Sequence, residues 1–101
     1  MESLGQFLKR EREFRGFSLE DVERMTKINS IVLSRIESDR YEELPTGTYL
    51  KGYLKLYAKA ISINLEDVLT RYQSLPSESK KEVHPFHQIG RFEAKPSYLK
   101  S

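Results

Sequence analysis

Helix-start signals divide this chain into short segments, and this division limits the possible folds more than any other feature of the sequence. At three places an apolar residue precedes one that caps helix N-termini. The pairs are Phe17–Ser18, Ile28–Asn29 and Ile63–Asn64. The capping side chain accepts a hydrogen bond from the first helical turn, while the apolar residue before it packs against that turn. Each pair therefore predicts the start of a new helix.

Apolar residues at helical spacing fill the segments between these signals. Gly16 is suited to the left-handed turn that ends a first helix. Pro45 biases Leu44 away from helix, so the fourth helix should begin near Thr46 or Gly47. The expected helices cover about residues 4–15, 19–26, 30–37, 46–62 and 65–75. The fold class expected is therefore all-α, a five-helix, repressor-like helix-turn-helix domain over residues 1–75.

Residues 76–101 differ from the rest in composition, since Ser, Pro, Lys and Glu are frequent and no apolar period is sustained. Too little apolar surface is present to offset chain entropy. We expect a flexible, basic linker. Residues 1–73 hold twelve basic and twelve acidic side chains, so the whole net charge of +2 lies in this tail. His84 and His87 also lie there, and a metal site would need more ligands than the sequence supplies.

The residues that usually carry catalysis are scarce. The chain has no cysteine and only those two histidines. No combination of serine, histidine and carboxylate falls within the expected helices. We therefore expect no enzyme, no cofactor and no metal.

The segment TYLKGYLKLYAKAI, residues 48–61, contains three tyrosines and three lysines, each set spaced four apart. They are Tyr49, Tyr53, Tyr57, Lys51, Lys55 and Lys59. Such a pattern fits a core helix, a nucleic-acid platform or a docking surface. Gly52 costs about 1 kcal/mol relative to alanine in mid-helix, so we expect helix one, helix five or a partner to approach the backbone there.

A helical wheel separates the apolar residues of this segment into two bands. The core stripe comprises Leu50, Leu54, Ala58 and Ile61. The second band comprises Tyr49, Tyr53, Leu56 and Ala60, roughly 110° to 120° away, with Tyr57 between the two. An apolar arc of about 200° is broader than one neighbouring layer covers, so part of it should be exposed.

DNA recognition is the alternative that a helix-turn-helix pattern raises, with the third helix as the recognition helix. The residues available for contact are Asn29, Ser30, Ile31, Ser34 and Arg35. Ile31 could touch a thymine methyl group and Arg35 a guanine or a phosphate. The set contains few bidentate donors, and residues 1–73 lack the net positive charge that usually supports DNA affinity.

The sequence LEDVERMTKINSIVLSRIESDRYEELPTGTYLKGYLKLYAKAISINLEDVLTRY resembles the cytoplasmic helix-turn-helix domain of the RodZ cell-shape proteins, an offshoot of the Xre and Cro-like repressor fold. The similarity runs from about Leu4 to Tyr72. Its most specific part is a series of residues in and before the fourth helix. These are Leu44, Pro45, Tyr49, Gly52, Tyr53, Tyr57 and Ala58, followed by the cap Asn64.

The resemblance implies a cytoskeletal adaptor that docks its fourth helix on the bacterial actin MreB through two aromatic residues four positions apart. Tyr53 and Tyr57 match those positions, with Tyr49, Lys51 and Lys55 as flanking contacts. It also implies a link to the inner face of the membrane through a downstream segment, and a role in rod cell shape. An Xre-type transcriptional regulator remains the alternative.

Overall fold

The computed structural model describes residues 2–76, which form five α-helices and one short 3₁₀ helix, with no strand in this range. The elements are α1 (Leu4–Phe14), α2 (Leu19–Thr26), α3 (Ser30–Glu37), η1 (Tyr41–Glu43), α4 (Leu50–Ile61) and α5 (Leu65–Gln73). The all-α helix-turn-helix architecture expected from the sequence is confirmed. The predicted linker, with His84 and His87, lies outside the described residues.

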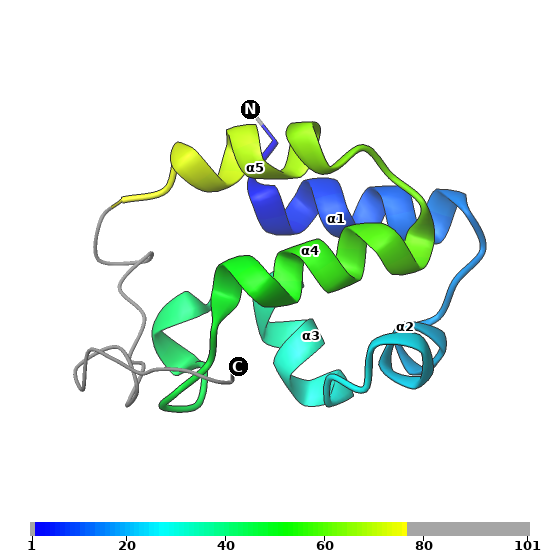
Figure 1. Cartoon of the computed structure of the whole chain (residues 1–101), viewed down its shortest axis with the longest axis horizontal. Coiled ribbons are helices and arrows are strands. Elements are labelled where there is room, and N and C mark those ends of the chain that lie inside the picture. Colours follow the sequence, from blue (N-terminus) through cyan, green and yellow to red (C-terminus); the bar gives the residue numbers. More distant parts are fainter. Residues whose placement is uncertain (1, 77–101) are drawn as a thin grey trace, which may run out of the picture.

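Helix α4 runs through the middle of the molecule (Figure 1). It packs against α5 on one side and α2 on the other, while α3 contacts both α1 and α2. The α2–α3 pair therefore forms a layer below α4 in this view, and α5 lies above it beside α1. This central position gives α4 neighbours on two sides and leaves another part of its circumference at the surface.

The predicted N-caps all form. Ser18 Oγ accepts from the Asp21 amide at 3.0 Å, and the Asp21 carboxylate accepts from the Ser18 amide at 2.9 Å. Asn29 Oδ1 accepts from the Ile31 amide and Asn64 Oδ1 from the Glu66 amide, each at 2.7 Å. These local bonds satisfy amides that the helices themselves leave without partners.

The predicted start of α4 near Thr46 or Gly47 is wrong, because the helix begins at Leu50. Gly47 has a φ of +91°, which is left-handed. Both the amide and the hydroxyl of Thr48 donate to the Pro45 carbonyl, at 3.1 and 2.7 Å. A turn therefore follows Pro45 and occupies the residues expected to form the first helical turn.

A close approach between α1 and the end of α3 closes the bundle. A Cβ atom placed on Gly5 would lie 2.5 Å from the Glu37 carbonyl oxygen and 2.6 Å from that of Ile36. Asp39, which follows α3 with a φ of +62°, accepts from the Gly5 amide at 2.9 Å and from the Ser3 hydroxyl at 2.5 Å. The N-terminus of α1 is thus tied to the chain 34 residues later.

Candidate partner-binding face of helix α4

The buried side of α4 is the one that the helical wheel predicted. Leu50, Leu54, Ala58 and Ile61 are each 2 % exposed or less. They belong to one core to which all five helices contribute side chains. Because this stripe is covered by α2 and α5, it holds α4 in a fixed orientation and determines which residues remain outside.

The second apolar band of the wheel reaches the surface, and we call Tyr49, Tyr53, Leu56 and Ala60 the outer band of α4. Tyr49 is 44 % exposed and Leu56 45 %. Tyr53 is half-buried against the core, and Ala60 is partly exposed. Spacings of four, three and four residues place these side chains in one row along the helix. The expected apolar excess of α4 is therefore present.

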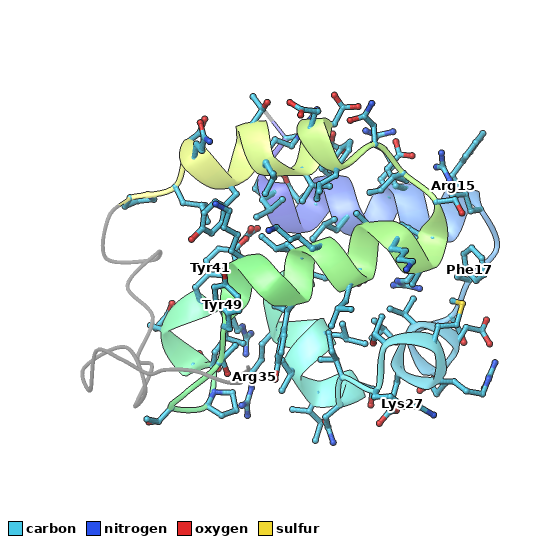
Figure 2. The ribbon with its side chains drawn as sticks, in the orientation of Figure 1. Arg15, Phe17, Lys27, Arg35, Tyr41 and Tyr49 are labelled. Atoms are coloured by element: carbon cyan, nitrogen blue, oxygen red, sulfur yellow. The ribbon has the colours of Figure 1, made fainter. Side chains whose placement is uncertain are left out.

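Tyr49 lies at the N-terminal end of α4 (Figure 2), where it is the residue before the first helical turn. Its ring covers Gly52, so a Cβ atom at Gly52 would lie 2.5 Å from Tyr49 Cδ2. The sequence predicted a close approach at Gly52 but assigned it to another helix or to a partner. The group that approaches is the aromatic ring of the residue three positions earlier.

The prediction that Tyr57 presents its ring to a partner is wrong, because Tyr57 is 1 % exposed. Its hydroxyl donates to the Glu37 carboxylate and lies 3.2 Å from the Leu8 carbonyl oxygen. Burial, reinforced by the bond to Glu37, raises the pKa of the phenol above its usual range. Tyr57 therefore connects α4 to α1 and α3 and offers no surface for docking.

Glu37 in turn forms a buried ion pair with Arg12. Arg12 Nε and Nη2 donate to the two carboxylate oxygens of Glu37 at 2.8 and 2.9 Å, and Nη1 donates to the Phe17 carbonyl at 2.9 Å. The bond to Glu37 raises the Arg12 pKa, although burial acts in the opposite direction. The fork geometry and the tyrosine hydroxyl satisfy a carboxylate that would otherwise be costly to bury.

The lysines of α4 are largely accessible. Lys55 and Lys59 are exposed and Lys51 is partly exposed. Lys51 and Lys55 were expected as flanking contacts, and on the helical wheel they lie about 140° and 100° from Leu56. Leu56 was not among the predicted contacts, although its wheel position placed it in the same band as Tyr49 and Tyr53. Its position on the wheel was the signal that could have identified it.

Two of the predicted DNA-contact residues already form hydrogen bonds within the domain. Asn29 caps α3, and Arg35 Nη1 donates to the Glu43 carbonyl at 3.0 Å. Figure 2 shows Arg35 beside the chain that leads from α3 to α4. Ile31 is 59 % exposed, while Ser34 is exposed and Ser30 partly so. This leaves a small surface with one large apolar side chain and few donors that could read bases.

Comparison with known proteins identifies similar domains. A family model described as a helix-turn-helix domain matches residues 7–68. Cytoskeleton protein RodZ of Streptococcus pneumoniae is 32 % identical over 72 residues, which make up 71 % of this chain and 26 % of that protein. The chain therefore spans about a quarter of the length of this curated relative.

Two solved structures have similar folds. YmfM from Staphylococcus aureus, a candidate DNA-binding membrane protein, has a TM-score of 0.67 and 28 % identity, covering 74 % of this chain and 93 % of that one. A chain from the structure in which the bacterial actin MreB assembles in complex with the cell shape protein RodZ has a TM-score of 0.62 and 31 % identity. That similarity covers 69 % of this chain and 85 % of the other. Within residues 2–76, no helix is long and apolar enough to cross a membrane.

Proposed function

Because this chain belongs to the RodZ family of helix-turn-helix domains, we propose that it is a non-catalytic adaptor that binds the bacterial actin MreB and serves cell shape. The outer band of α4 is the docking surface. The observation that carries this proposal is a row of apolar side chains that remains exposed or partly exposed although Leu50, Leu54, Ala58 and Ile61 already fill the core.

The chemistry of the outer band suits a protein partner. Aromatic side chains at the surface supply large contact areas at a small cost in rotamer entropy, and they dominate many protein interfaces. Tyr49 and Tyr53 provide the aromatic contacts, and Leu56 extends the apolar row. Lys51 and Lys55, on a neighbouring side of α4, would suit an acidic patch on the filament, which would favour encounter and register.

The proposal also places the domain at the cytoplasmic face of the bacterial inner membrane. Support comes from the five basic residues in the last 22 positions of the chain, Lys80, Lys81, Arg91, Lys95 and Lys100. Basic segments are attracted to the anionic lipids of the cytoplasmic leaflet. Membrane attachment itself would belong to a segment downstream of the domain, as the resemblance implies.

Co-sedimentation with MreB filaments from the same organism tests the docking surface. We expect Tyr49→Ala combined with Tyr53→Ala to weaken binding at least about thirtyfold, since aromatic anchors at interfaces often contribute about 2 kcal/mol or more. Phe14→Ala is the matched control, because Phe14 is an aromatic residue on α1 that is 83 % exposed. Circular dichroism establishes that both variants remain helical. Undiminished co-sedimentation of the folded double variant would refute the proposed surface.

A DNA-binding regulator is less favoured. Asn29 and Arg35 already bond within the domain, and the region of residues 1–73 has no net charge to support phosphate binding. Changes at Tyr49 and Tyr53 separate the two functions. They should weaken co-sedimentation with MreB, whereas DNA binding would depend on residues of α3. A regulator would instead lose DNA affinity on Arg35→Ala and show a steep dependence on salt.

A further inference from the structure

Gly52 is in unusually close contact with the ring of Tyr49. A Cβ atom on Gly52 would lie 2.5 Å from Cδ2, 2.9 Å from Cε2 and 3.3 Å from Cγ of that ring. The first two distances are shorter than any normal contact between carbon atoms. One edge of the ring therefore occupies the space that a side chain at position 52 would fill, and Tyr49 can lie there only because residue 52 is glycine.

Other reasons for a glycine at this position do not apply. Gly52 lies within α4 and is not among the residues with positive φ, so its backbone does not require glycine. The three atoms nearest to a Cβ atom at position 52 would all belong to Tyr49, and none to a neighbouring helix. Gly52 is the third residue of α4, where alanine would nevertheless favour the helix more than glycine does. The ring of Tyr49 is the feature that accounts for the glycine.

We propose that Gly52 is a positioning residue for partner binding, which holds the Tyr49 ring against the backbone of α4. In this position the ring continues the row formed by Tyr53 and Leu56, so the partner meets one apolar surface that exists before binding. Preorganised side chains improve affinity because less freedom is lost in the complex. This inference rests on the proposed function, in that the partner is the actin-like filament that docks on the outer band.

Three variants of the full chain test the inference: Gly52→Ala, Tyr49→Ala and the two combined. We expect Gly52→Ala to displace the ring and to weaken MreB binding about tenfold, as loss of an interface anchor does. Its melting temperature should not fall, since alanine favours helix. When Tyr49 is already alanine, the change at Gly52 should have no further effect on affinity. A purely structural role for Gly52 would not produce this dependence on Tyr49.

Nuclear magnetic resonance of the unaltered chain supplies an independent measurement. Contacts between the Tyr49 ring protons and the Gly52 α-protons are expected, and their absence would overturn the inference whatever the variants do. Ser34→Ala is the matched control, because it also favours helix at an exposed position but lies on α3. It should leave MreB affinity unchanged.

The outcomes separate the two proposals. If Tyr49→Ala weakens binding but Gly52→Ala does not, Gly52 has no positioning role and the docking surface stands. If neither Tyr49→Ala nor the combined change at Tyr49 and Tyr53 affects binding, the docking surface itself is wrong, and the inference fails with it. Equal losses for Gly52→Ala with and without the Tyr49 ring would also contradict the inference.

Discussion

Three tyrosines at the same spacing, two on α4 and one at its N-cap, have three different environments. Each step of four residues turns the side chain by about 40°, so Tyr57 points about 80° away from Tyr49. This rotation carries the row from the surface, through the half-buried Tyr53, into the core. The resemblance assigned docking to Tyr53 and Tyr57, whereas exposure favours Tyr49 and Tyr53. Identical residues at regular spacing thus do not share one role.

The buried hydroxyl of Tyr57 predicts a loss of stability at high pH. Burial and the bond to Glu37 raise the phenol pKa above its usual value of 10.0. Below pH 10 the proton is bound in both the folded and the unfolded chain. Above it the unfolded chain releases a proton that the folded chain retains, so the free energy of unfolding should fall by up to about 1.4 kcal/mol per pH unit.

Urea denaturation between pH 9 and 11, with Tyr57→Phe for comparison, measures this dependence. The variant should lose about 1.5 to 3 kcal/mol at pH 7, because a bond to a charged group is removed, and its stability should decline less steeply above pH 10. Some decline should remain, since burial and Asp39 also raise the pKa of Tyr41. If the free energy of unfolding fell equally steeply with pH in the two proteins, folding would not raise the pKa of Tyr57.

At the level of the helix, local signals determined where most elements begin. Ser18, Asn29 and Asn64 each cap the helix that the sequence assigned to them. The start of α4 was misplaced because no side chain caps it, and a turn after Pro45 delays the helix to Leu50. Capping residues therefore predicted helix starts correctly. The start of α4 has no cap and depends on the backbone geometry of a turn, which the sequence pattern did not indicate.

The cap of α5 gives a prediction at this scale. Asn64 Oδ1 accepts from the Glu66 amide at 2.7 Å and is 3.4 Å from that of Asp67. Asn64→Ala should lower the free energy of unfolding by about 1 kcal/mol, measured by thermal denaturation. Asn64→Asp keeps an acceptor at the cap and should retain most of the stability. A melting temperature for Asn64→Ala equal to that of the unaltered chain would exclude a stabilising cap.

For the molecule as a whole, the close approach of α1 to α3 fixes the layers around α4. Gly5 permits this approach because a Cβ atom would meet two backbone carbonyl oxygens at 2.5 and 2.6 Å. Neither carbonyl can move without shifting the end of α3. Gly5 and Gly52 therefore differ: the first admits a neighbouring helix, and the second admits a side chain at the surface.

Gly5→Ala should consequently destabilise the domain by about 1 to 3 kcal/mol, the usual effect of overpacking. Chemical denaturation provides the measurement, with Lys9→Ala at an exposed position of α1 as control. Unlike Gly52→Ala, the change at Gly5 should leave MreB affinity unaltered wherever the variant is folded. A variant with full stability would show that α1 and α3 can separate without cost.

The sequence alone determined the all-α class, four of the five helix starts to within a residue, the core stripe of α4 and its excess of apolar residues. These features depend on interactions within one or two helical turns. Only the tertiary structure decided that Tyr57 lies inside, because Glu37 and Leu8, its polar contacts, are 20 and 49 residues away along the chain. Likewise, the location of the Tyr49 ring over Gly52 required atomic positions. Burial depends on which distant elements meet, and spacing along one helix does not specify those neighbours.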